Sequence, residues 1–155
     1  MDPFFQVLAD SFTSLHAGIL NALELLPVEA LDWKPGTEMN SIGVIIVHLT
    51  GAERFLIGDV IMGEPSNRNR EAEFQTSGMS KLDLIERLNQ SNAYIAAAFE
   101  KLNLSDLETT RIHPRHGNQV SVAWALLHTL EHTGNHLGHI ELTVQLWQAQ
   151  HAMKS

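Results

Sequence analysis

The sequence predicts an all-α protein, a four-helix bundle with long connections between its helices. Four segments carry apolar residues at intervals of three and four, the spacing of a helix that turns one face to a core. The segments between them are polar or rich in proline and glycine, and no part of the chain shows the alternation or paired turns of a sheet. Its 155 residues suit a single domain over 1–155 with a core of ordinary size.

The first helix is predicted from a stripe of apolar side chains that ends at Pro27. This stripe consists of Phe5, Leu8, Phe12, Leu15, Ile19, Ala22 and Leu26. The following PVEALDWKPGTEMN contains two prolines and a glycine, so it cannot be one regular element. A second helix is predicted to begin near Asn40 and Ser41, which both make good N-caps, and to end near Met62, before Gly63.

The second half of the chain predicts two more helices, each preceded by a polar connection. SNRNREAEFQTSG is interpreted as a loop with at most a short helical turn, and a third helix is predicted over about 80–102. LSDLETTRIHPRHGNQ is interpreted as a second long loop. The fourth helix is predicted over about 120–150.

Composition excludes several kinds of function. The net charge of −8, without a basic block, argues against nucleic acid or an anionic membrane surface as partner. No apolar span of membrane length occurs and the first residues lack a secretory pattern, so a cytoplasmic protein is expected. The absence of cysteine removes disulfides, thiolate ligands and a cysteine nucleophile.

Histidines are concentrated in the segment HTLEHTGNHLGHIELT of the fourth helix. Four of the nine histidines in the chain, His128, His132, His136 and His139, lie there. Because a helix turns about 100° per residue, these four side chains fall within one sector about 80° wide. The same sector contains Ala125, Thr143 and Leu146. It is therefore predicted to face the core.

Two histidines four residues apart on a helix can bind one divalent cation. His48 in the second helix offers a third imidazole, on a stripe that also carries Val44, Ala52 and Phe55. A lone histidine in such surroundings is more often a structural core residue. Beside a histidine-rich neighbouring helix a metal site becomes the favoured interpretation, because one cation gives several buried imidazoles a partner.

Two stretches resemble the DinB/YfiT-like superfamily: EHTGNHLGHIELT, and LDWKPGTEMNSIGVIIVHLTGAERFLIGDVIMGEP with its single histidine. The order and lengths of the predicted helices also fit, so the resemblance covers nearly the whole chain. It implies a DinB-like four-helix bundle, often a homodimer, in which three histidines hold a divalent metal, typically zinc or nickel.

Carried over by motif, the ligands are His48, His132 and His136. The residue after Gly138 is often glutamine in the family and is His139 here. His139 is therefore left as a fourth ligand, a hydrogen-bonding partner of a ligand, or neither. His128 is predicted to support a ligand or line the pocket, with a plain surface histidine as the alternative.

Three neutral imidazoles leave a position open for water or substrate, as in catalytic zinc sites. Such a centre can activate water or hold a thiol as thiolate. The resemblance implies a metal-dependent transferase that uses a low-molecular-weight thiol of the bacillithiol, mycothiol or glutathione class. The alternatives are a metal-dependent hydrolase and a non-catalytic, stress-related protein that binds a metal or a small ligand.

No general base can be named from spacing. Glu53, Glu131 and Glu141 point away from the ligand face of their own helices, and Asp59 lies about 16 Å along the helix from His48. The missing carboxylate favours chemistry on a thiolate over activation of water.

The loop IHPRHGNQ and its neighbours contain two arginines and two histidines to consider. Arg111 and Arg115 could contact an anionic cosubstrate, and His113 and His116 could cover the mouth of a pocket. A plain solvated loop is the interpretation preferred here for all four.

Overall fold

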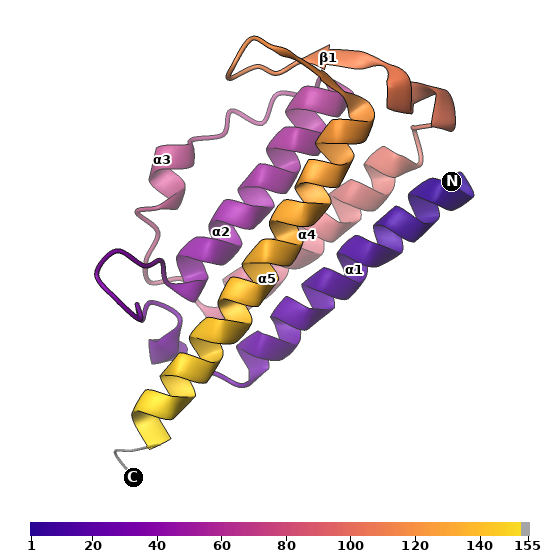
Figure 1. Cartoon of the computed structure of the whole chain (residues 1–155). Helices are drawn as coiled ribbons and strands as arrows, with labels where there is room; N and C mark the ends of the chain where they lie inside the picture. The colour runs from indigo at the N-terminus through magenta and orange to yellow at the C-terminus, as the bar shows by residue number, and fades with distance from the viewer. Residues whose placement is uncertain (153–155) are drawn as a thin grey trace.

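The structure is a computed structural model that describes residues 1–152. Its framework is four long helices that run side by side (Figure 1). They are α1 (Pro3–Glu24), α2 (Ile42–Glu53) with its continuation η2 (Arg54–Met62), α4 (Lys81–Phe99) and α5 (Val122–Ala152). The short elements are the 3₁₀ turns η1 (Val28–Ala30) and η3 (Leu104–Glu108), the helix α3 (Arg70–Glu73), and the strands β1 (Thr110–Ile112) and β2 (Gln119–Ser121).

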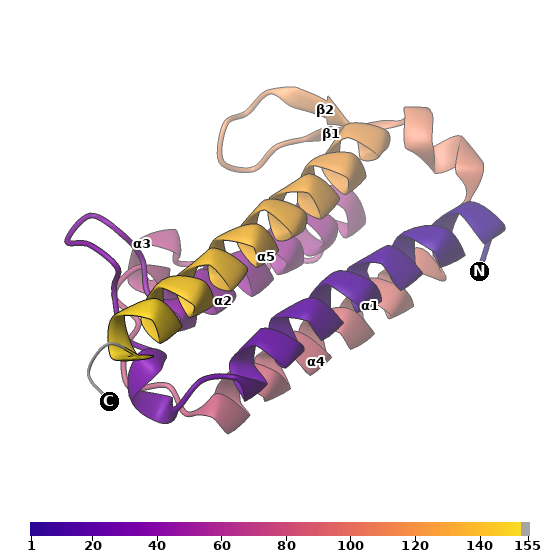
Figure 2. The same cartoon turned by 60° about the horizontal axis from the view of Figure 1, so that its bottom comes forward.

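The helices pack as a bundle in which α1 contacts both α4 and α5, and α2 contacts the same two helices on its side of the bundle (Figure 2). The predicted four-helix bundle is confirmed. No helix within residues 1–152 combines the length and the apolar character that a membrane crossing requires.

Capping residues set the helix ends close to the predicted positions. Ser41 accepts a hydrogen bond from the backbone N–H of Val44 at 3.3 Å, and Ser80 forms a capping box with Asp83. Gly63 ends η2 in the left-handed conformation, with φ of 68°. Ser41 and Gly63 are the local signals from which the bounds of the second helix were predicted.

The second helix has the predicted extent but not a regular geometry. From Arg54 to Met62 it is a π-helix. The Arg54 side chain lies against Gly58, where a Cβ would clash with the guanidinium, and stacks over the Tyr94 ring with Cζ 4.4 Å from its centroid. The absence of a side chain at position 58 therefore makes room for the arginine in the widened turn.

The prediction that the chain contains no sheet is wrong in one place. Strands β1 and β2 pair antiparallel, with Arg111 opposite Val120. The turn is closed by a 2.9 Å hydrogen bond from the His113 N–H to the Asn118 carbonyl. Three residues per strand are too few to produce a recognisable alternation, so the hairpin leaves no periodic signal.

A polar layer separates two apolar clusters in the core. One cluster contains Phe12 and Ile57, the other Ile19 and Ile46. Between them lies Glu53, fully buried.

Glu53 is bonded to one residue from each of the other three helices. The distances are 2.9 Å to His16 Nε2, 2.7 Å to Thr133 Oγ1 and 2.5 Å to Ser91 Oγ. This layer fixes the rotation and height of the four helices relative to one another.

Candidate metal centre

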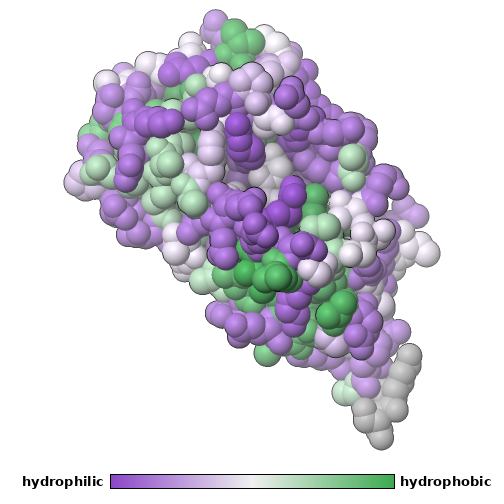
Figure 3. Space-filling view, turned by 180° about the vertical axis from the view of Figure 1, so that it is seen from behind, coloured by the Kyte–Doolittle hydropathy of each residue, from purple (hydrophilic) through white to green (hydrophobic). Residues whose placement is uncertain are grey.

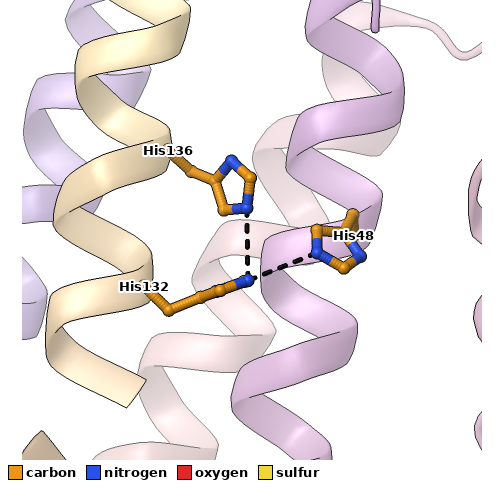
Figure 4. Close-up of side chains that lie close together, drawn as sticks. All are labelled: His48, His132 and His136. Carbon is orange, nitrogen blue, oxygen red and sulfur yellow. Dashed lines mark hydrogen bonds between the residues drawn. The ribbon is translucent and has the colours of Figure 1, made fainter. Parts of the chain in front are cut away.

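Three imidazoles meet between α2 and α5 (Figure 4). His48 comes from the middle of α2, and His132 and His136 come from successive turns of α5. The Nε2 atom of His132 lies 3.3 Å from that of His48 and 3.2 Å from that of His136. One nitrogen from each ring falls within 4.8 Å of the other two, so the group could hold a metal ion.

The spacing of these nitrogens fits a tetrahedral ion. Zinc binds imidazole nitrogen at about 2.0–2.1 Å, which places two neighbouring ligands of a tetrahedron roughly 3.3 Å apart. Two of the three nitrogen pairs have this separation. The group could therefore supply ligands to a tetrahedral ion.

The site keeps the imidazoles of His132 and His136 neutral. Burial, with the charges of His136 and His48, lowers the pKa of His132 from 6.5 to about 3. Burial and the charge of His48 lower the pKa of His136 to about 4. At neutral pH both rings therefore offer a lone pair to a cation without first losing a proton.

Glu73 is the carboxylate that the sequence did not reveal. It lies at the end of α3, and its Oε2 is 3.0 Å from Nδ1 of His48. When Nδ1–H donates a hydrogen bond to a carboxylate, Nε2 keeps a free lone pair and the plane of the ring is fixed. Glu73 thus points the binding nitrogen of His48 toward His132.

Arg68 holds Glu73 in place through a two-pronged ion pair. The guanidinium Nε and Nη2 lie 2.5 and 2.8 Å from the two carboxylate oxygens. Burial would raise the pKa of Glu73, but hydrogen bonds from Arg68 and His48 outweigh it and hold the pKa below its ordinary value. The carboxylate is therefore ionised, and its oxygens are already engaged.

The segment that carries Arg68 and Glu73 can approach α2 because position 51 has no side chain. A Cβ at Gly51 would clash with the Glu73 carboxylate and would lie 3.3 Å from Arg68 Nε. Asn69 caps α3 by accepting a hydrogen bond from the Ala72 N–H at 3.0 Å. The expected loop with a short helical turn is therefore an ordered wall of the site.

The prediction that all four histidines of α5 face the core is wrong for two of them. The buried face of α5 is marked by Thr133. Thr133 lies about 60° round the helix from His136, about 100° from His132, about 120° from His139 and about 140° from His128. The four histidines thus form a flank of the buried face. His132 and His136 are half-buried, and His128 and His139 are exposed.

The two outer histidines remain near the group of three. The His128 ring stacks on Trp124 with centroids 4.7 Å apart and lies 6.4 Å from the His132 ring. The centroid of the His139 ring is 5.5 Å from that of His136. Neither residue belongs to the group whose nitrogens lie within 4.8 Å of one another.

A cavity of about 450 Å³, here called the metal cavity, opens beside His48 and His132. Three arginines and one glutamate line it, and the ion pair with Glu73 neutralises Arg68, which leaves a charge of +1 at this wall. The lining residues are His48, Ala52, Phe55, Leu56, Arg68, Arg70, Glu71, His113, Pro114, Arg115, His116, His128 and His132.

The hairpin loop forms part of this wall, contrary to the preferred interpretation of a solvated loop. His113 is buried, its ring stacks on that of His116 at 4.6 Å, and burial lowers its pKa. Arg115 also lines the metal cavity. Arg111 does not, and instead donates a hydrogen bond to the Ile61 carbonyl at 3.2 Å.

The chain belongs to the DinB superfamily, whose model matches residues 12–140. The resemblance inferred from the sequence is confirmed. A search of curated proteins by sequence found no match.

Solved bacterial structures share the fold. YfiT from Bacillus subtilis, described as a probable metal-dependent hydrolase with an unusual four-helix bundle topology, is 14% identical with a TM-score of 0.73, over 94% of this chain and 88% of YfiT. A conserved protein from Enterococcus faecalis is 14% identical with a TM-score of 0.73, over 91% and 95% of the two chains. A DinB-like protein from B. subtilis is 18% identical with a TM-score of 0.68, over 89% of each chain.

Proposed function

We propose that this chain is a metal-dependent transferase that joins a low-molecular-weight thiol to an electrophilic small molecule, with His48, His132 and His136 as ligands of zinc or nickel. The observation that carries the proposal is the group of three imidazole nitrogens spaced for one ion at the edge of a cationic cavity. Imidazole suits either metal. A homodimer and a cytoplasmic location stay predictions.

In the proposed reaction, the side chains of the protein bind the metal and the substrate and orient them. A bound divalent ion with an open position would hold the sulfur as thiolate. Glu73 orients His48, and Arg70 and Arg115 offer cationic groups to the substrate.

The atoms of the transfer balance without an oxidant or a reductant. The sulfur forms the new bond to the electrophilic carbon, and the leaving group departs with its electron pair. The S–H proton leaves to solvent or to the His128 imidazole in the cavity wall.

The charge of the cavity narrows the thiol class. Glutathione and bacillithiol carry carboxylates, which the arginines can bind, whereas mycothiol carries none. The proposed cosubstrate is therefore a carboxylated thiol.

A metal-dependent hydrolase is the second candidate, and one observation favours it. Glu71 lines the metal cavity and forms no ion pair among residues 1–152, so its carboxylate is available as a general base. Glu73 is unsuited to that role because Arg68 and His48 engage it.

The experiment incubates tag-free, metal-loaded protein with each of the three thiols and a chromogenic electrophile, and in parallel with ester substrates without thiol. The expected result is conjugation with glutathione or bacillithiol, reduced at least about a hundredfold in the His132→Ala/His136→Ala variant. Ester hydrolysis without thiol would contradict the transferase proposal and support the hydrolase. Stoichiometric metal without turnover of any substrate would support a non-catalytic metal-binding protein.

A further inference from the structure

A second cavity, of about 580 Å³, lies between α2, α4 and the segment 66–76. Its volume is that of a pocket for a small organic molecule. It is here called the arginine cavity, and it shares only Arg68 with the metal cavity. Its lining residues are Val47, Thr50, Gly51, Arg54, Ser66, Arg68, Asn69, Ala72, Glu73, Thr76, Arg87, Gln90, Ser91 and Tyr94.

The wall of the arginine cavity is positive although the protein is acidic. Three arginines face Glu73 in the wall, and Asp59 pairs with Arg54, which leaves a charge of +1, while the whole chain carries −8. Seen from behind, on the side where α4 lies, the surface is largely hydrophilic and is hollowed near its middle (Figure 3). A positive pocket on an acidic protein concentrates anions and disfavours cations.

Of the three arginines in the arginine cavity, Arg87 alone forms no ion pair with a described residue. Arg54 pairs with Asp59 at 3.4 Å, and Arg68 pairs with Glu73. Arg87 donates Nε to the Thr50 hydroxyl at 3.3 Å and forms no ion pair with any residue of 1–152. The rest of its half-buried guanidinium can therefore bind a ligand.

Ser66 provides an independent sign of a missing partner. Its hydroxyl oxygen is buried and has no hydrogen-bond partner among the described residues, although the residue lines the cavity. A buried hydroxyl without a partner costs free energy, which a ligand with acceptor atoms would recover.

From these observations we propose that the arginine cavity binds a small organic anion carrying a carboxylate or phosphate group, with Arg87 as its principal cation and Ser66 as a hydrogen-bond donor. Arginine suits this role because its planar fork can donate two parallel hydrogen bonds to either group. The site is separate from the metal-dependent activity proposed above and does not depend on it.

The experiment titrates the full chain with succinate and with inorganic phosphate, using calorimetry and the Nε–Hε signals of the arginines in NMR spectra. Metal-loaded protein and the His132→Ala/His136→Ala variant are measured in parallel, so that anions bound to a metal are recognised. The expected result is saturable binding of at least one probe in both proteins, with shifts at Arg87.

Matched variants locate the binding. Arg87→Gln is expected to weaken it by about tenfold to a hundredfold, the value of hydrogen bonds to a charged group. Arg87→Lys keeps the charge, and we expect it to fold and to bind with intermediate strength. Lys34→Gln removes one positive charge outside both cavities and is expected to bind the probes like the parent. Arg115→Gln removes one positive charge from the metal cavity and reports any binding there.

Two outcomes overturn the proposal. One is the absence of saturable binding of both probes. The other is binding that Arg115→Gln weakens and the Arg87 variants do not, since this would place the anion in the metal cavity.

Discussion

Glu73 and His48, 25 residues apart in the sequence, are joined by a hydrogen bond of 3.0 Å between Oε2 and Nδ1. Through this bond the connection between the second and third long helices becomes part of the metal centre. The Arg68 guanidinium donates two hydrogen bonds to the same carboxylate. Two residues of the connection between η2 and α4, Arg68 and Glu73, thus act on the orientation of one ring.

Glu73→Gln is expected to weaken metal binding by about tenfold to a hundredfold, the usual effect of losing the carboxylate behind a histidine ligand. The amide keeps the shape of the side chain but not the charge that holds His48 and Arg68. Competition with a chromophoric chelator measures the affinity. Glu71→Gln removes the neighbouring exposed carboxylate and should bind metal like the parent, and equal affinities for both variants would contradict the role of Glu73.

The ligand assignment predicts a stoichiometry. Protein purified without a histidine tag should contain close to one equivalent of zinc or nickel, and His48→Ala, His132→Ala and His136→Ala should each lose most of it, because two imidazoles hold a divalent ion poorly. His139→Ala should retain the metal, since this exposed ring lies outside the group of three. Elemental analysis of the parent and the four variants measures the bound metal. Loss of metal from the His139 variant would indicate that His139 is also a ligand.

The stability of metal-free protein should depend on pH through His132 and His136. Their folded-state pKa values of about 3 and about 4 lie below the ordinary value of 6.5. The unfolded chain therefore binds more protons as the pH falls below 6.5, and the free energy of unfolding decreases until the pH reaches the folded values. Above pH 6.5 these two groups contribute no pH dependence.

Urea unfolding of chelator-treated protein at about pH 7.5 and about pH 5 tests this linkage. The His132→Gln/His136→Gln variant has no titrating group at these positions and should lose less stability between the two conditions than the parent. Identical losses would show that the two imidazoles are not held neutral in the fold.

Glu53 and Thr133 connect α2 and α5, the helices that carry the three histidines, through the polar layer of the core. Thr133→Val removes a donor from a buried carboxylate and is expected to lower the free energy of unfolding by about 1–3 kcal/mol. Thr143→Val is the matched control, because this buried hydroxyl bonds only to the His139 carbonyl of its own helix. Equal losses in the two variants, measured by urea unfolding, would show that the bond to Glu53 adds nothing.

The three histidines are the part of the site that could be predicted from helical geometry. His132 and His136 are one turn apart, so their proximity follows from the sequence, and the apolar surroundings of His48 marked it as an inward-facing residue. The exposure of His128 and His139 could not be foreseen, because the buried residues of α5 centre about 75° round the helix from the middle of the histidine sector.

Glu73 and the hairpin were beyond the reach of sequence patterns. Glu73 lies in a polar loop, and nothing in its neighbourhood shows that the chain folds back over α2. The one related signal is Gly51, a glycine in the middle of a helix, which marks a close approach without naming what approaches. The strands on either side of His113 give no sequence signal either, since three residues are too few to show an alternating pattern.

Gly51→Ala should weaken metal binding although position 51 contributes no ligand. A methyl group there would occupy space that the Glu73 carboxylate and the Arg68 guanidinium now fill, so the carboxylate must move away from His48. Gly134→Ala provides the control within α5, because a Cβ at that position meets nothing within 4 Å. Alanine there should stabilise the helix by about 0.5–1 kcal/mol and leave metal binding unchanged. If chelator competition gives Gly51→Ala the affinity of the parent, the contact between the α2–α4 connection and the helix does not control the orientation of His48.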